Sequence, residues 1–433
     1  MFSKGFIHSN GAVLAAGMLL LSGGSVAALN RDTAVISEEL VGGPTTAYNH
    51  ASTICQAPDG TLLVAWFGGS LEGADDVSIY LSRNSGAGWS PIVEVNKGIR
   101  EDSKDYACWN PVLFTASSGT IYLYYKISSI QYSVDPAGYH NWWGCYQTSV
   151  DNGVTWSARQ WLPTSTYTYL ANFGTHLTGP VKNKPLELPN GKLLCGSSTE
   201  TDAWRVHLET GAAGNWTGSI SVTGPITSSL GIIQPTFLHT PGYDTIQMIC
   251  RNESGNYPYR AWSYNTGQTW TSATALTGIT AIVGLDGVTL SNGKHVLAHN
   301  PAGARYPLRL ASCLDGTTWS DVLTSLDVNG TNNMDYPSII QSRDGRIHIV
   351  HSWGRSAIKH LVLDASYVTG GPPTRTLPSV AQPAKRIIAG TDIQMFDIFG
   401  RKISRKDLPG RPAGICLVRS KSAQFCEVKM LVK

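Results

Sequence analysis

The chain has 433 residues, of which only 15% are charged, and it contains 45 glycines, 13 tryptophans and 18 tyrosines. Its formal net charge is +3, but from Lys385 onward 11 Lys or Arg stand against 4 Asp or Glu, so the rest of the chain has a small acidic excess. This distribution excludes a basic nucleic-acid-binding surface on the main body. The composition is typical of a turn-rich β protein, and the length permits one large domain with an appendage.

The N-terminus has the pattern of a secretory signal peptide. Lys4 precedes an apolar run over residues 12–21, and small residues follow up to Ala27 and Ala28. The run is too short to span a bilayer as a helix. We therefore expect residues 1–28 to be a signal peptide and the protein to be secreted to the extracellular space or the cell envelope, with no membrane span.

Short alternating runs bounded by Asp-Gly and Asn-Gly turns continue from there to about residue 366. Examples are Thr61–Trp66, Thr120–Tyr125, Lys192–Cys195, Gln247–Cys250 and Arg346–Val350. Period-two alternation between turn residues is typical of β-strands. The sequence predicts one all-β domain over residues 35–366.

One eight-residue pattern recurs within this domain: a Ser, then Asp or Asn two residues later, then Gly, and a final Trp. Its copies are Ser149–Trp156 and Ser263–Trp270, the looser Ser82–Trp89 and Ser312–Trp319, and a degraded copy at Glu209–Trp216. The polar residues favour a tight turn, and the Trp can pack beneath it. The copies are spaced by about 50 residues or a multiple, which is the length of a four-stranded propeller blade. Counting strands and copies gives five or six blades, and we expect six.

After residue 366 the alternating strand-like runs end and a segment that contains Gly and Pro follows. Residues 367–385 begin with a Gly-Gly-Pro-Pro segment and are expected to form a linker. Residues 386–433 are expected to form a small β module. Asp397–Arg401 and Leu408–Gly410 partly resemble the C-terminal sorting modules of bacterial secreted enzymes, which implies sorting or attachment at the cell envelope; a small accessory β-sandwich is the alternative. Cys416 and Cys426 can form a disulfide there.

The sequence gives no sign of a cofactor. None of the eight cysteines forms a Cys-x-x-Cys pair, and the glycine-rich stretch 68–73 lacks the phosphate-loop pattern. We expect no metal and no cofactor. Cys55, Cys195 and Cys250 lie in apolar runs and are expected to be buried thiols.

The recurring turns resemble the Asp boxes of the sialidase superfamily, and the resemblance covers roughly residues 40–364. Arg251, just before the Ser263 turn, and Arg305, just before the Ser312 turn, match two arginines of that family, and Tyr336 in Asp335-Tyr336-Pro337 matches its late tyrosine. The resemblance implies a six-bladed β-propeller of sialidase type. It also implies that Arg251 and Arg305 bind a sugar carboxylate and that Tyr336 is the nucleophile or stabiliser.

Two positions depart from the family pattern. His50 stands where the family has its first arginine, and Gln234 stands where it has a glutamate that takes the proton of the tyrosine. Gln234 cannot act as a base, and Glu200 is a possible substitute. The acid/base position falls on Glu72, with Asp75 and Asp76 as alternatives. His50 would assist binding or proton transfer.

Other residues are candidates for lining the opening of the propeller at which Tyr336 and the two arginines are expected. Lys182 and Lys184 would place two amines near the axis, and Trp109, Asn110 and Trp204 would supply a surface for sugar stacking and hydrogen bonding. Arg355 and His360, late in the domain, are expected to pair with carboxylates.

These features favour a monomeric secreted glycoside hydrolase that acts on terminal sialic acid or another acidic sugar of a glycan or glycoconjugate. Two alternatives remain: a polysaccharide lyase on uronate glycans, in which His50 or Tyr336 removes a proton, and a carbohydrate-binding propeller without catalysis.

Overall fold

The computed structural model describes most of the domain and part of the C-terminal segment. The described residues are 29–43, 45–128, 142–164, 176–200, 204–212, 216, 221–223, 230–327, 333–370, 393–396, 402–403 and 417–420. The chain divides into two compact units, Met1–Thr374 and Arg375–Lys433.

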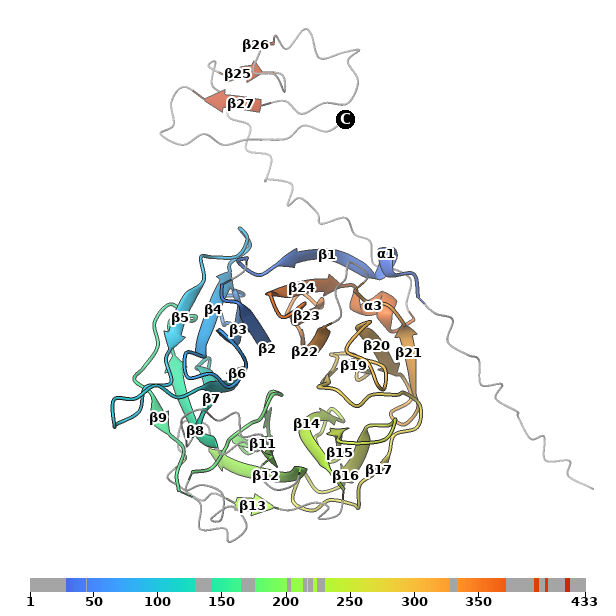
Figure 1. Ribbon diagram of the computed structural model, residues 1–433. Helices are drawn as coiled ribbons and strands as arrows, with labels where there is room; N and C mark the ends of the chain where they lie inside the picture. Colours follow the sequence, from blue (N-terminus) through green and yellow to red (C-terminus); the bar gives the residue numbers. More distant parts are fainter. Residues whose placement is uncertain are drawn as a thin grey trace, which may run out of the picture. The chain divides into compact units, whose positions relative to one another are not determined.

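Six four-stranded antiparallel sheets surround a central axis in the first unit, so the fold is the expected six-bladed all-β propeller of sialidase type (Figure 1). The first blade consists of β2 (Tyr48–Gln56), β3 (Leu62–Gly69), β4 (Ser78–Asn84) and β5 (Val93–Asn96), and the second of β6 (Cys108–Thr115), β7 (Ile121–Ser128), β8 (Trp142–Ser149) and β9 (Gln160–Trp161). The third consists of β10 (Leu186–Glu187), β11 (Lys192–Glu200), β12 (Trp204–Ala212) and β13 (Ser221–Thr223), and the fourth of β14 (Ile232–His239), β15 (Ile246–Asn252), β16 (Tyr259–Ser263) and β17 (Thr274–Ala275). The fifth consists of β18 (Asp286–Thr289), β19 (His295–His299), β20 (Arg309–Cys313) and β21 (Trp319–Leu323).

The last blade is completed by the first strand of the domain. Its strands are β22 (Met334–Gln341), β23 (Ile347–Trp353), β24 (Ala357–Leu363) and β1 (Val35–Leu40), and β1 pairs antiparallel with β24. Short helices α1 (Arg31–Ala34) and α3 (Ala365–Val368) flank this joint. Pairing the two ends of the domain closes the ring and protects the edge of the last sheet.

The repeated eight-residue pattern forms the outer turns of the blades, as predicted. Ser149 Oγ donates to Asp151 Oδ1 at 2.8 Å and accepts from Gly153 N at 2.9 Å. In the blade of β14–β17, Ser263 Oγ accepts from Gly267 N at 2.8 Å. These turns join the third and fourth strands of their blades, so they stabilise the fold and lie away from the axis.

Buried residues fill the space between neighbouring sheets. Trp66, Phe67, Tyr124 and Tyr125 are among the largest fully buried side chains. Six cysteines are buried free thiols, including Cys55, Cys195 and Cys250, as expected: Cys55, Cys108, Cys145, Cys195, Cys250 and Cys313.

The innermost chain segment of five blades carries one non-glycine residue at positive φ. These residues are Ala51 (52°), Asn110 (38°), Lys182 (66°), which precedes β10, Gln234 (55°) and Tyr336 (55°). In β2, β6, β14 and β22 the register shifts at this residue. A bulge interrupts the alternation of side chains between the two faces of a sheet. The side chain of the bulge residue therefore points in a direction that the regular strand would not give it.

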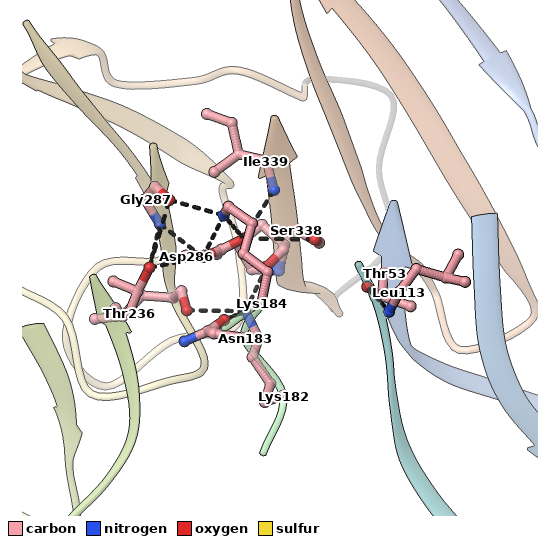
Figure 2. Close-up of polar contacts among 12 residues, drawn as sticks. Thr53, Leu113, Lys182, Asn183, Lys184, Thr236, Asp286, Gly287, Ser338 and Ile339 are labelled. Atoms are coloured by element: carbon pink, nitrogen blue, oxygen red, sulfur yellow. Dashed lines mark hydrogen bonds and ion pairs between the residues drawn. The ribbon is translucent and has the colours of Figure 1, made fainter. Parts of the chain in front are cut away.

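A buried polar network ties the inner segments together deeper along the axis (Figure 2). The Asp286 carboxylate accepts from Lys184 Nζ at 2.9 Å and 3.0 Å, from Thr236 Oγ1 at 2.8 Å and from Ile339 N at 3.0 Å. Asp286 is fully buried. Because these donors come from three other blades, the network fixes the spacing of the strands that carry the bulges.

The second unit has a three-stranded sheet in the order β26 (Lys402–Ile403), β25 (Ile393–Phe396) and β27 (Leu417–Ser420). The proposed signal peptide, most of the proposed linker and the pair Cys416 and Cys426 lie outside the described residues. Among the helices that are described, none is long and apolar enough to cross a membrane.

We predict that Gly153→Ala destabilises the domain more than Gly293→Ala. Both glycines have nearly the same φ, +78° and +79°, but a Cβ at Gly153 would lie 2.2 Å from Cδ2 of buried Leu63, whereas a Cβ at Gly293 would meet no atom within 4 Å. Gly293→Ala should cost about 1 kcal/mol from the left-handed backbone alone. Gly153→Ala should cost a further ~1–3 kcal/mol from overpacking.

Urea unfolding of the two variants measures the difference. Equal losses of unfolding free energy would show that the outer turn does not pack tightly on the neighbouring blade.

Candidate active site

Tyr336 lies at the centre of the candidate site. Its hydroxyl accepts from Arg251 Nη1 at 2.6 Å and from Gln234 Nε2 at 3.4 Å. The three residues come from β22, β15 and β14, and Tyr336 and Gln234 are the bulge residues of their strands. Two donors directed at one phenol oxygen stabilise negative charge on that oxygen.

His50 packs beside the tyrosine. Its ring centroid is 4.2 Å from that of Tyr336, and its Nδ1 lies 2.6 Å from Ser352 Oγ. Burial lowers the pKa of His50 well below its usual value, and the charges of Arg355, Arg305, Arg251 and Lys182 lower it further. His50 is therefore neutral around pH 7 and can accept or donate a single ring proton.

Asp335 forms ion pairs with two arginines next to Tyr336 and His50. Its fully buried carboxylate accepts through Oδ2 from Arg355 Nη2 at 3.0 Å and from Arg305 Nη1. His50 Nδ1 lies 3.9 Å from the other oxygen, Oδ1. Asp335 therefore compensates part of the positive charge that gathers around Tyr336.

Arg355 is held in place by a tight turn between β23 and β24. Gly354 and Arg355 have φ of 61° and 62°, and Ser356 N donates to Trp353 O at 3.2 Å. The two residues at positive φ form the centre of this turn, and the loop of residues 354–356 joins the paired residues Trp353 and Ala357. Asn49 N donates to Arg355 O at 2.6 Å, which fastens this turn to the start of β2. A non-glycine residue in this conformation is costly and points to a functional role for its side chain.

Glu72 is tied to the same arginine. Tyr48 Oη donates to Glu72 Oε2 at 2.6 Å, Arg355 Nη1 donates to Tyr48 Oη, and Arg355 Nη1 lies 3.6 Å from Glu72 Oε2. The Glu72 side chain is 39% exposed, so it can reach solvent or a ligand. Burial, and next the Glu72 charge, raise the pKa of Tyr48. Tyr48 is therefore a neutral phenol that donates to the carboxylate.

The two alternatives to Glu72 lie elsewhere. Asp76 accepts from Ser70 N and Ser70 Oγ, both at 2.9 Å. Asp75 and Asp76 line a separate cavity of about 480 Å³ that also includes Tyr80 and Glu94. Of the three carboxylates, Glu72 is the one that contacts the arginine bound to Asp335.

Two of the predicted lining residues, Trp109 and Asn110, are buried. The structure does not support Trp109 as a stacking surface, because it is 3% exposed, packs against Trp142 and donates from Nε1 to Ser128 Oγ at 2.8 Å. Asn110 is also buried, and its carbonyl accepts from Lys126 Nζ at 3.4 Å. The apolar strand pairs around both residues explain why they are enclosed.

The two lysines are not open amines either. Lys182 Nζ is buried and donates to Asn183 Oδ1 at 2.9 Å, to Leu285 O at 2.8 Å and to Pro337 O, and burial lowers the pKa of Lys182 to about 7. Lys184 binds Asp286 and lines a cavity of about 520 Å³ formed with the later halves of β2, β6 and β22. His50 and Tyr336 lie in the first halves of β2 and β22, so Lys184 reaches away from the tyrosine.

Trp204 lies next to Arg251, with the guanidinium carbon 4.6 Å from its ring centroid. Its strand partner Glu200 is 8% exposed. Burial raises the pKa of Glu200 to about 7, although Arg251 acts in the opposite direction.

Asp335, Tyr48 and Arg355 belong to the site although the sequence pattern does not mark them as site residues. Arg355 pairs with carboxylates as expected, but these are the carboxylates of the site itself. A signal for Arg355 was present, since Gly354-Arg355 follows an alternating strand and fits a tight turn. His360, the other late candidate, lies 3.4 Å from Glu39 in a different part of the blade.

No group of three or more His, Cys, Asp or Glu side chains among the described residues could hold a metal ion. Among the described residues, the side-chain groups available for chemistry at the site are a phenol, an imidazole, carboxyl groups and guanidinium groups.

Comparison with known proteins agrees with this architecture. Residues 60–349 match the BNR repeat-like domain. The chain therefore belongs to the BNR repeat-like domain family and is a divergent member of the sialidase superfamily. No curated protein sequence is significantly similar to it.

Solved structures share the fold at low sequence identity. A protein of unknown function from Dyadobacter fermentans is 14% identical, with a TM-score of 0.61, over 76% of this chain and 98% of that one. The intramolecular trans-sialidase of Ruminococcus gnavus, solved with oseltamivir carboxylate, is 12% identical, with a TM-score of 0.58, over 77% and 98%. An α-L-arabinanase of Penicillium chrysogenum, solved with arabinobiose, is 16% identical, with a TM-score of 0.52, over 76% and 98%. The fold is thus one that glycoside hydrolases use.

We predict that Asp335→Asn lowers the unfolding free energy by about 3–5 kcal/mol, because it leaves two guanidinium groups without their buried carboxylate. Urea unfolding measures the loss. Asp32→Asn is the control, since its contact with Arg31 is 3.7 Å long and its side chain is 88% exposed; it should change stability by no more than about 0.5 kcal/mol. Similar small effects in both variants would show that Asp335 does not hold the site together.

We also predict that the protein loses stability as the pH falls below about 6.5, in part because of His50. The pKa of this buried histidine is lowered, so the unfolded chain binds a proton first, and each pH unit below 6.5 costs about 1.4 kcal/mol per such group. His50→Gln should remove one such contribution, measured as a smaller acid slope of the unfolding free energy.

His295 and His348, whose pKa values burial lowers to about 4, remain in both proteins and give the residual slope. An unchanged slope in His50→Gln would contradict a neutral His50.

Proposed function

We propose that the protein is a secreted glycoside hydrolase that removes a terminal acidic sugar, sialic acid or a related sugar acid, from a glycan or glycoconjugate. The observation that carries this proposal is the 2.6 Å contact between Arg251 Nη1 and Tyr336 Oη at the mouth of the propeller. A guanidinium at this place can stabilise the phenol oxygen as a nucleophile and can bind the carboxylate that an acidic sugar carries beside its anomeric carbon.

The arginines around the tyrosine support an acidic ligand. The guanidinium carbons of Arg251 and Arg305 lie 5.7 Å and 5.9 Å from the Tyr336 ring centroid. Arg305 remains 38% exposed while it is paired with Asp335, so it can also reach a ligand. Arg251 and Arg305 are the proposed carboxylate ligands, and Arg355 positions Asp335 and Glu72.

The proposed reaction is a double displacement. Tyr336 Oη attacks the anomeric carbon, the glycosidic bond breaks, and protonated Glu72 gives its proton to the leaving oxygen. Water then attacks the anomeric carbon, the bond to Tyr336 breaks, and Glu72 takes the proton of the water. A tyrosine suits an anomeric carbon that bears a carboxylate, because a carboxylate nucleophile would be repelled there. His50 would take up the proton of the Tyr336 phenol in the first displacement and return it to the tyrosine oxygen when the bond to Tyr336 breaks in the second.

A uronate lyase is the second candidate, and neutral His50 at 4.2 Å from the Tyr336 ring favours it. In a lyase, one of these groups removes the proton next to the carboxylate, the bond to the leaving oxygen breaks with transfer of a proton, and a conjugated double bond forms. The amide of Gln234, which stands where a hydrolase would place a base, fits this chemistry.

Two further expectations belong to the same proposal. Residues 1–28 would direct export, and residues 386–433, after the linker 367–385, would serve sorting or attachment. The protein would act as a monomer outside the cell or at the cell envelope.

We predict that the purified full-length protein releases free sugar acid from a sialylated glycoprotein and that Tyr336→Phe lowers this rate at least 100-fold, because the nucleophile is lost. Chromatographic measurement of the released sugar is the assay, and Tyr264→Phe, an exposed tyrosine of an outer turn, is the control.

Release of an ultraviolet-absorbing product from a uronate polymer, in place of sugar acid, would instead identify the lyase. Glycan binding without turnover, unaffected by Tyr336→Phe, would identify a binding protein.

A further inference from the structure

Tyr48 holds the carboxyl group of Glu72 by one of its two oxygens. The hydrogen bond and the ion pair that the described residues make with this carboxyl group both go to Oε2: Tyr48 Oη donates to it at 2.6 Å, and Arg355 Nη1 lies 3.6 Å from it. The Glu72 side chain is 39% exposed. A distance of 2.6 Å is typical of a strong hydrogen bond from a hydroxyl to a carboxylate. The phenol therefore occupies Oε2 and leaves Oε1 to face a ligand.

The tyrosine is itself held in one orientation. Its ring stacks on Phe67, with centroids 6.4 Å apart and an interplanar angle of 15°, and the guanidinium carbon of Arg355 lies 5.3 Å from its centroid. Its backbone pairs with Gly69, the last residue of β3 before the loop that carries Glu72. Arg355 Nη1 donates to Tyr48 Oη, so the single proton of the phenol is directed to Glu72.

The backbone of the Glu72 loop is closed by bonds that do not involve Tyr48. Ser70 N and Ser70 Oγ both donate to the Asp76 carboxylate at 2.9 Å. These bonds fix the course of the loop, but they do not reach the carboxyl group of Glu72. The carboxyl group therefore takes its orientation from Tyr48 and Arg355.

We propose that Tyr48 is a positioning residue for Glu72 and that it assigns the proton transfer to Glu72 Oε1. In the first displacement, the bond between Oε1 and its proton breaks, the proton goes to the leaving oxygen, and the bond between that oxygen and the anomeric carbon breaks. In the second, Oε1 takes the proton of the attacking water. The negative charge that forms on Glu72 in the first displacement faces the Tyr48 hydroxyl and the Arg355 guanidinium, which are in place before the reaction.

The inference rests on the proposed function for its effect on turnover, and it predicts a dependence on the leaving group. A sugar hydroxyl needs a proton to leave, whereas a nitrophenolate leaves without one. For Tyr48→Phe we expect kcat/KM on a sialylated glycan to fall about 30-fold, and kcat/KM on the para-nitrophenyl glycoside of sialic acid to change by less than about 3-fold. Glu72→Gln should show the same selectivity, with a loss of about 100-fold or more on the glycan.

Tyr106→Phe is the matched control, because Tyr106 Oη also donates to a carboxylate at 2.6 Å, that of Asp102 in the loop before β6. This control should leave both rates unchanged. In the double variant of Tyr48→Phe and Glu72→Gln the losses should not add, since Tyr48 acts through Glu72. Equal losses on both substrates in Tyr48→Phe, an unchanged rate on the glycan, or additive losses in the double variant overturn the proposal.

A titration without substrate separates this inference from the proposed function. Burial, and next the charge and hydrogen bond of Glu72, raise the pKa of Tyr48; Arg355 lowers it, and Asp335 raises it. The ultraviolet difference between the wild type and Tyr48→Phe reports phenolate formation at Tyr48, and the same pair is prepared with Glu72→Gln. Because the Glu72 charge is then absent, we expect the phenolate signal at lower pH in the second pair.

If the wild type cleaves neither substrate, the proposed function fails and this titration alone decides. Identical titrations in the two pairs overturn the contact between Tyr48 and Glu72.

Discussion

The buried carboxylate of Asp335 is the interaction on which the candidate site depends. It binds Arg305 and Arg355, which come from the loop after β19 and from the turn between β23 and β24, and it lies directly before Tyr336. Guanidinium groups cannot shed their charge, so a cluster of them needs a compensating anion wherever water is excluded. Groups that can lose a proton respond in the other way: burial, and next the charges of Arg355 and Arg305, lower the pKa of His50, and burial lowers the pKa of Lys182 to about 7.

This compensation also limits the ligand. Three guanidinium groups stand beside Asp335 and Glu72, while His50 is neutral. Positive charge remains whether or not Glu72 carries the proton that the proposed reaction needs, and this suits the proposed ligand, a sugar acid with one negative charge. It suits a highly sulfated or phosphorylated chain much less, because each further anion would have to compete with the internal carboxylates.

The propeller fold repeats one backbone position, in the innermost segment of a blade, at which a site residue can be held. In five of the six blades, the innermost segment carries a non-glycine residue at positive φ, and two of these residues, Gln234 and Tyr336, meet above the axis. Rigid strands with a bulge give a more precise site than a loop does, since the network around Asp286 fixes the strands beneath it. Sialidases and an arabinanase share the propeller fold with this chain at 11–16% identity, so one fold is built from widely different sequences.

The sequence by itself determined the all-β propeller, because the outer turns with their terminal Trp are local patterns that recur at blade spacing. Resemblance to the sialidase pattern also made Tyr336, Arg251, Arg305, Gln234 and His50 candidate site residues, and the structure brings these side chains close together. Only the tertiary structure decided which candidates meet. Trp109 and Lys182 are buried and Lys184 is paired with Asp286, whereas Asp335, Tyr48 and Arg355 belong to the cluster around the tyrosine. The reason is physical: burial and charge compensation depend on residues far apart in the chain, such as Tyr48 and Arg355 with a separation of 307, and no local pattern records those contacts.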